Sequence, residues 1–181
     1  MIPDYQSLML PVLELVSGGQ EYKFRDLIER LAIKFQVSDQ ERKELLPSGA
    51  AAIFDNRVGW AVTYLKKAGL LTSHKRGSYV ITELGQDVLR SKPGRIDAKY
   101  LRQFPGFMTF ITTSRISNEK EGENKTSEES VSQTPEEAMG KAYQQLRNAL
   151  AYDLLNKVVE MSPAFFERLV VELLVRMGYG G

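Results

Sequence analysis

The 181-residue sequence contains no cysteine and one histidine, His74. Disulfide scaffolds and thiolate metal sites are therefore excluded, and a single histidine cannot build a zinc site from several histidines. The first ten residues, MIPDYQSLML, lack the basic region of a signal peptide. No apolar run approaches the roughly 18 to 20 residues that cross a bilayer. We therefore expect a soluble, cytoplasmic protein with no membrane partner.

Charge is unevenly distributed along the chain, although the net charge is only +1. Residues 1–56 carry 6 basic and 9 acidic side chains, residues 57–102 carry 10 and 3, and residues 103–181 carry 8 and 11. The middle block thus has a net charge of +7 between two flanks of −3. Such a block indicates a polyanionic partner for residues 57–102. A solvated, lysine-rich face without a partner is the alternative.

Apolar residues at helical spacing predict three main helices in the N-terminal part. They run from Pro3 to Gly18, from Phe24 to Phe35, and from Phe54 to Ala68. Ser38, with Glu41 at the capping-box position, predicts a short helix over 38–46 between the second and third.

Two short β-rich segments follow, 70–72 and 79–82, joined by the basic, glycine-containing turn 74–78. This pattern predicts a hairpin. Three helices followed by a basic hairpin is the order of a winged helix-turn-helix domain, which binds DNA. The predicted fold class is therefore mainly α with a small β-hairpin.

Beyond the hairpin, Thr82 caps a short helix that extends to Leu89, and residues 95–102 form a further helix or turn closed by Pro105-Gly106. Residues 117–134 hold five Glu, two Lys and one aliphatic residue, a composition typical of a disordered linker. Thr134-Pro135-Glu136-Glu137 then begins a helix to about Met161, and Ser162-Pro163 begins another that ends at Gly178. We therefore expect a winged-helix domain over 1–105, a connecting segment and linker over 106–134, and a helical segment over 135–181.

The third helix and the hairpin turn carry the candidate DNA contacts. Asn and Arg suit bidentate contacts with adenine and guanine, and the start of a recognition helix usually approaches the bases. Lysine and arginine suit phosphates. Trp60 is a core residue instead if the helix phase shifts by one position. The candidate DNA-binding residues are Asn56, Arg57, Trp60, Thr63, Tyr64, Lys66, Lys67, His74, Lys75 and Arg76.

The C-terminal segment carries two carboxylates, Glu167 and Glu172, which are five residues apart and do not share a helix face. Metal-dependent hydrolysis requires several converging carboxylates. Residue by residue, the segment is an amphipathic helix with two solvated acids, and it predicts no metal site.

The same segment, PAFFERLVVELLVRMGYGG (163–181), resembles the start of the catalytic domain of Mrr-type restriction endonucleases, where a Phe-Glu-x-Leu-Val helix ends in Met-Gly-Tyr. Two N-terminal stretches, YQSLMLPVLELVSGG and NRVGWAVTYLKKAGLL, are similar to the N-terminal domain of that family. The resemblance covers essentially the whole chain. It implies a type IV restriction enzyme that cleaves foreign DNA carrying methylated bases, using a Mg²⁺-dependent PD-(D/E)xK nuclease domain and working as a homo-oligomer.

The family's catalytic Asp and Gln-x-Lys segment would follow residue 181, so the resemblance implies no catalytic residue in this chain except, as a weak candidate, Glu167. We therefore expect the DNA-recognition portion of a truncated nuclease, inactive by itself and without a cofactor of its own. The alternative is a winged-helix transcription regulator or protein-docking module with no connection to a nuclease.

Overall fold

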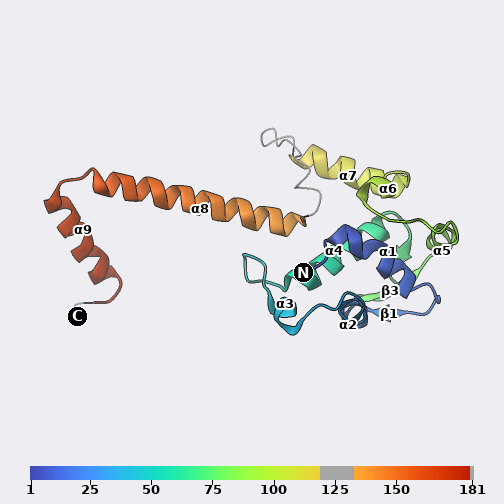
Figure 1. The fold of residues 1–181 in the computed structure, drawn as a ribbon. Helices are drawn as coiled ribbons and strands as arrows, with labels where there is room; N and C mark the ends of the chain where they lie inside the picture. The colour runs from blue at the N-terminus through green and yellow to red at the C-terminus, as the bar shows by residue number, and fades with distance from the viewer. Residues whose placement is uncertain (119–132, 180–181) are drawn as a thin grey trace. The chain divides into compact units, whose positions relative to one another are not determined.

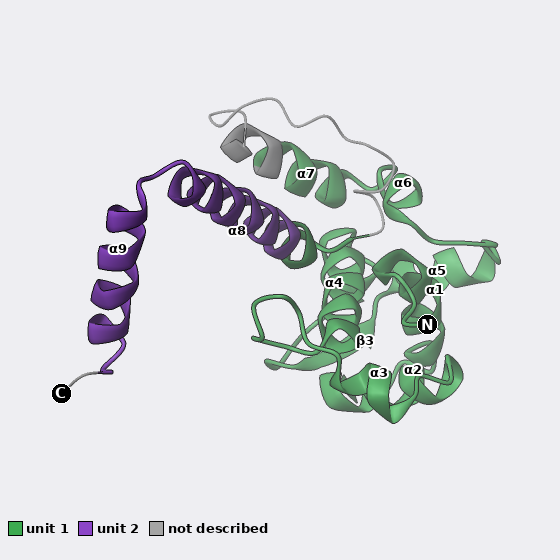
Figure 2. Ribbon diagram, turned by 60° about the vertical axis from the view of Figure 1, so that its left-hand side comes forward, with its two compact units in different colours: residues 1–138 green, residues 139–181 purple. Residues whose placement is uncertain are grey.

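The computed structural model describes residues 1–118 and 133–179 (Figure 1). It divides into two compact units, Met1–Ala138 and Met139–Gly181 (Figure 2). Unit 1 is mainly helical with a small antiparallel sheet. Its elements are α1 (Tyr5–Leu15), β1 (Tyr22–Lys23), α2 (Phe24–Lys34), α3 (Asp39–Lys43), α4 (Ile53–Lys67), β2 (Leu71–Thr72), β3 (Ser78–Ile81), α5 (Glu83–Arg90), α6 (Ala98–Leu101) and α7 (Pro105–Asn118). Helix α8 (Pro135–Val159) begins in unit 1 and continues into unit 2, which also contains α9 (Pro163–Arg176).

The core of unit 1 is built around α4, which packs against α1, α2, α6 and α7. The apolar stripe predicted for this helix is buried: Val58, Ala61, Val62 and Leu65. Burying an apolar side chain of this size stabilises the fold by about 1.5–3 kcal/mol, so this stripe determines which side of α4 faces inward. The opposite side remains for other contacts.

The sheet has three strands in the order β1-β3-β2, all antiparallel. The predicted hairpin is present, with Leu71 opposite Ile81 and Thr72 opposite Val80. Strand β1 was not predicted, because a two-residue strand leaves no period in the sequence. It pairs Tyr22 with Tyr79, and so attaches the start of α2 to the hairpin.

Short polar side chains cap several helices, and the caps at Ser38 and Thr82 are among those that the sequence predicts. Ser38 and Glu41 form the predicted capping box of α3, and Thr82 caps α5. Asp4 caps α1, where its carboxylate accepts hydrogen bonds from the backbone N–H groups of Gln6 and Ser7. Burial alone would raise the pKa of Asp4, but hydrogen bonds from Ser7 and Gln6 outweigh it and hold the pKa below its usual value.

Two glycines fix the join between α4 and the helix that follows the hairpin. Gly69 ends α4 with φ +79°, a left-handed conformation that favours glycine. Gly85, in α5, lies against the backbone of Leu70: a Cβ there would stand 2.3 Å from the Leu70 carbonyl oxygen. Helix α5 therefore approaches the start of β2 as closely as a backbone without a side chain allows.

Helix α7 corrects one sequence expectation. The sequence predicts that Pro105-Gly106 closes the preceding helix and that a connecting segment begins at residue 106. In the structure Pro105 is instead the first residue of a helix, a position that tolerates proline because its N–H would be unpaired anyway. Phe107 of this helix is fully buried in the core of unit 1. The short helix expected over 38–46 is also smaller than predicted, since α3 ends at Lys43.

The predicted disordered linker, 117–134, coincides only in part with the described residues. Residues 117–118 end α7, Thr134 precedes α8, and residues 119–132 lie outside the described part of the chain.

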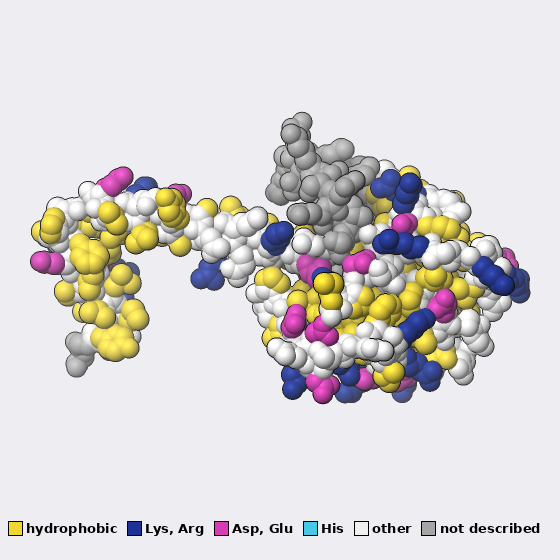
Figure 3. Space-filling view, in the orientation of Figure 1, with side chains coloured by type: hydrophobic (Ala, Val, Ile, Leu, Met, Phe, Trp, Pro, Cys, Tyr) yellow, Lys and Arg dark blue, Asp and Glu magenta, His cyan; other side chains and the backbone are white. Residues whose placement is uncertain are grey.

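In unit 2, Ser162 caps α9 as predicted. The apolar side chains of both its helices are largely exposed (Figure 3), among them Leu146, Leu150, Leu154, Phe166, Val170 and Leu173. Within the described residues, no helix is long and apolar enough to cross a membrane.

Candidate nucleic-acid interface

Of the ten candidate DNA-binding residues, seven lie on α4 and three lie in the turn between β2 and β3. Apart from Thr63, they fall into three environments. Those at the start of α4 contact residues 134–137, which we call the acidic turn: Thr134, Pro135, Glu136 and Glu137. Tyr64, in the last turn of α4, lies in an aromatic cluster. The basic set, defined as Lys66, Lys67, His74, Lys75 and Arg76, is exposed.

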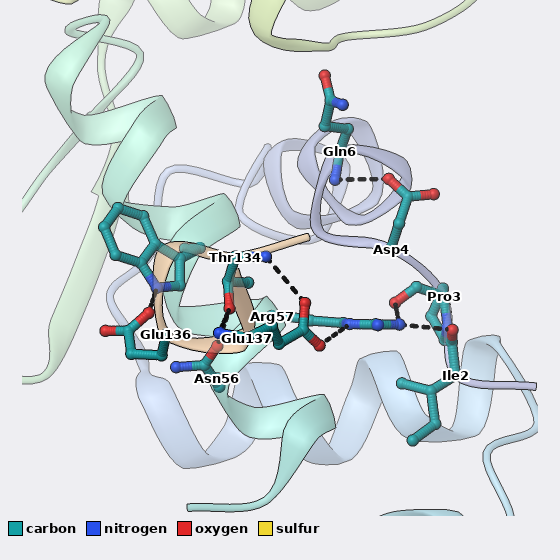
Figure 4. Close-up of polar contacts among 10 residues, drawn as sticks. Ile2, Pro3, Asp4, Gln6, Asn56, Arg57, Thr134, Glu136 and Glu137 are labelled. Carbon is teal, nitrogen blue, oxygen red and sulfur yellow. Dashed lines mark hydrogen bonds and ion pairs between the residues drawn. The ribbon is translucent and has the colours of Figure 1, made fainter. Parts of the chain in front are cut away.

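Arg57 joins three segments of unit 1 (Figure 4). Its Nε donates a hydrogen bond to Glu137 Oε1 at 2.8 Å, and its Nη1 donates to the carbonyl oxygens of Ile2 at 2.9 Å and Pro3 at 3.1 Å. The side chains of Arg57 and Glu137 are only 19% and 10% exposed. The guanidinium is thus engaged by acceptors of its own chain, and Glu137 balances its charge.

The acidic turn makes two further polar contacts with α4. The Trp60 indole Nε1 donates to the carboxylate of Glu136. The Thr134 hydroxyl donates to Asn56 Oδ1 at 2.7 Å. Thr134 and Glu137 also form a capping box between themselves, with the Thr134 N–H donating to Glu137 Oε2 at 2.8 Å. The acidic turn therefore covers the part of α4 that the sequence assigns to base contacts.

Tyr64 lies among aromatic rings from α1, α4 and α7. Its ring meets Phe107 at 5.2 Å, Tyr5 at 5.4 Å and Phe110 at 5.9 Å between centroids, in edge-to-face geometry. Trp60 also meets it edge to face, at 5.6 Å. Burial raises the pKa of the Tyr64 hydroxyl above its usual value, so this group stays neutral. These contacts make Tyr64 part of the packing that holds α7 on α4.

The basic set extends from the end of α4 to the turn between β2 and β3. Lys66 and Lys67 line an open hollow of about 440 Å³ together with Val62, Thr63 and Tyr79. The Thr63 hydroxyl donates to the Gly59 carbonyl at 2.8 Å, so it already has one partner.

The turn that carries His74, Lys75 and Arg76 is held in place by backbone hydrogen bonds. The Phe24 N–H donates to the Gly77 carbonyl at 2.8 Å, and the Ser78 N–H donates to the Lys75 carbonyl at 3.1 Å. The exposed cations of this turn are therefore presented on an ordered backbone. Polyanions are bound by such cations through their phosphate oxygens.

The described residues do not provide a place for a catalytic metal. In residues 1–118 and 133–179, no group of three or more Asp, Glu or His side chains lies close enough together to hold an ion. Glu167 is exposed on α9, and Glu172 on the same helix pairs with Arg176 at 2.9 Å. The Mg²⁺ implied by the family resemblance therefore does not fit this part of the chain.

Sequence reasoning missed the docking of the acidic turn and the backbone carbonyls that bind Arg57. The motif Thr-Pro-Glu-Glu correctly indicated the start of α8, because capping is local. Its contact with α4 spans 76 to 80 residues, and a single sequence carries no signal for such a pairing.

Comparison with known proteins identifies relatives of this chain. Residues 5–91, from α1 through α5, match the family model of the Mrr N-terminal domain. The chain is 30% identical over 185 residues to the type IV methyl-directed restriction enzyme EcoKMrr of Escherichia coli (strain K12), and the alignment covers 99% of this chain. Residues 5–91 are thus identified as an Mrr N-terminal domain. This confirms the resemblance drawn from the sequence. The chain spans 60% of the length of the Mrr relative that it matches, and no solved structure matches it.

Proposed function

We propose that unit 1 is a winged-helix domain that binds double-stranded DNA, as the recognition portion of an Mrr restriction enzyme. The observation that carries this proposal is the exposed basic set at the end of α4 and on the hairpin turn. The order α2, α3, α4 and then the β2–β3 hairpin agrees with a winged helix whose recognition helix is α4. In this arrangement Lys66, Lys67, Lys75 and Arg76 contact phosphates.

The remaining candidates divide by what the structure leaves accessible. His74 and Thr63 are polar groups near the cations, and they supply hydrogen bonds to the duplex. Asn56, Arg57 and Trp60 reach DNA only where the acidic turn does not occupy them. Tyr64 acts through packing, because its ring lies within the aromatic cluster.

The name of the Mrr relative, a methyl-directed type IV restriction enzyme, supports methylated DNA as the substrate of the complete enzyme. We further propose that α8 and α9 correspond to the start of a PD-(D/E)xK nuclease domain, and that residues 1–181 alone do not cleave DNA. The largely exposed apolar side chains of both helices support this, since a complete domain buries such a stripe. The same exposed stripe would support a homo-oligomer. Mg²⁺-dependent cleavage would require residues outside this chain.

The test compares one duplex with and without methylated bases, by fluorescence anisotropy at two salt concentrations. We expect binding that weakens steeply with salt, tighter binding of the methylated duplex, and no cleavage on addition of Mg²⁺. Absence of binding at low salt would refute DNA recognition. Equal affinity for both duplexes would refute methyl recognition by this portion. A strong preference for one sequence regardless of methylation would instead favour a transcription regulator.

A further inference from the structure

We propose that the acidic turn is an intramolecular competitor of DNA: it occupies Asn56, Arg57 and Trp60, and a duplex binds at full strength only after Thr134–Glu137 has left α4. This inference rests on the proposed DNA binding by unit 1. The occupied surface is the start of α4, and the occupant is a segment of the same chain that carries two carboxylates.

The contacts are of the kind that a DNA backbone would make. Arg57 Nε and Trp60 Nε1 are N–H donors, and the oxygens that they meet belong to the carboxylates of Glu137 and Glu136. Phosphate oxygens are anionic acceptors of the same type, and arginine binds both groups through charge-assisted hydrogen bonds. Because a carboxylate and a phosphate cannot occupy one donor together, the acidic turn and a duplex exclude each other there.

The two carboxylates also oppose DNA by repulsion. The Lys and Arg residues that precede β3 attract a polyanion toward the same domain, and two fixed negative charges on α4 reduce that attraction. The acidic turn thus lowers affinity twice, by occupying donors and by adding negative charge to the surface that a duplex approaches.

Separation breaks the Arg57–Glu137 ion pair, but each partner keeps other hydrogen bonds. Arg57 keeps its hydrogen bonds to the carbonyls of Ile2 and Pro3. The capping box between Thr134 and Glu137 is internal to the acidic turn, so the start of α8 keeps its cap after release. Trp60 keeps its ring contact with Tyr64. Docking of the acidic turn is therefore reversible. The contact involves few residues, but the acidic turn and α4 belong to one chain and so meet at high effective concentration.

The deciding experiment measures duplex affinity of the double variant Glu136→Gln, Glu137→Gln. Glutamine at 137 still completes a capping box, so the variant removes the charges and preserves the helix start. The control is Asp153→Asn, Glu160→Gln, two exposed acids of unit 2, which changes the net charge by the same amount. If the docked state is populated about ten to one, the double variant binds about tenfold more tightly than the control.

The outcomes separate the two proposals. If the unmodified chain, the control and the double variant all bind no duplex at low salt, DNA binding itself is refuted. If they bind and the double variant binds no more tightly than the control, the acidic turn is a fixed structural clasp and the competition is refuted.

A second variant tests the contact directly. The chain has no cysteine, so Asn56→Cys with Thr134→Cys introduces the only two thiols, at side chains that touch in the structure. The oxidised protein cannot release the acidic turn, so it should bind duplex at least about tenfold more weakly than the same protein after reduction. Failure of the thiols to crosslink would show that the two positions do not meet. Equal affinity before and after reduction would show that docking does not oppose DNA.

Discussion

Neutralising the four Lys and Arg residues of the basic set should change how DNA affinity depends on salt. The perturbation is the quadruple variant in which Lys66, Lys67, Lys75 and Arg76 become Gln. Each phosphate contact contributes about 0.9 to the slope of log K against log salt concentration, so four contacts contribute about 3.6. Between ~50 and ~200 mM salt, the unmodified chain should lose about 150-fold in affinity through these contacts. The variant should lose that part of the salt dependence.

The assay is anisotropy of a labelled duplex over a series of salt concentrations, and the slope is the measured quantity. The control neutralises four exposed cations of unit 2, Lys141, Arg147, Lys157 and Arg168, which gives the same change in net charge. All eight positions are exposed, so each substitution should change the free energy of unfolding by less than about 0.5 kcal/mol. A slope that is unchanged in the variant, or equally reduced in the control, would refute the assignment of phosphate contacts.

Three further predictions concern the scaffold, and urea denaturation tests each of them. Tyr64→Ala should lower the free energy of unfolding by about 3 kcal/mol because it empties the centre of the aromatic cluster, whereas the exposed Tyr143→Ala should have almost no effect. Gly85→Ala should cost about 1–3 kcal/mol, since its Cβ would stand 2.3 Å from the Leu70 carbonyl oxygen. Asp4→Asn keeps a cap but removes a titrating carboxylate whose folded pKa is depressed, so the unmodified chain should hold its extra stability above pH ~4 and lose it as pH falls below that value. If the difference between Asp4 and Asn persisted at low pH, the carboxylate would not be its source.

The predictable parts of this fold are those encoded in neighbouring residues. The inner stripe of α4, its end at Gly69 and the capping box of Ser38 and Glu41 each depend on residues a few positions apart. Strand β1 depends on pairing with β3, about 55 residues later, and its two residues carry no pattern of their own. Helix α7 was missed for a different reason: Pro-Gly at its start has the composition of a terminator, and only the burial of Phe107 shows that the segment packs on the core.

Only part of the candidate site could be predicted from the sequence. The exposure of Lys66, Lys67, Lys75 and Arg76 follows from the charge block and the helix phase, both visible in the sequence. The positions of Trp60 and Tyr64 do not, because their partners come from α1, α7 and the acidic turn. Aromatic residues on the outer side of a helix are equally compatible with a ligand and with a neighbouring helix, and only the tertiary structure distinguishes these possibilities.

The distribution of charge acquires a structural meaning from these contacts. The acidic flank that begins after residue 102 contacts the basic block. Its Glu136 and Glu137 accept hydrogen bonds from Trp60 and Arg57, at the start of that block. One cation of the block, Arg57, is thereby neutralised within the chain, while Lys66, Lys67, Lys75 and Arg76 remain exposed. The number of salt-dependent DNA contacts therefore depends on whether the acidic turn is docked. While it is docked, the four exposed cations contact phosphates. Once it is released, Arg57 contacts a phosphate as well. Each further contact steepens the salt dependence by about 0.9, so release is distinguishable from a mere change in overall charge.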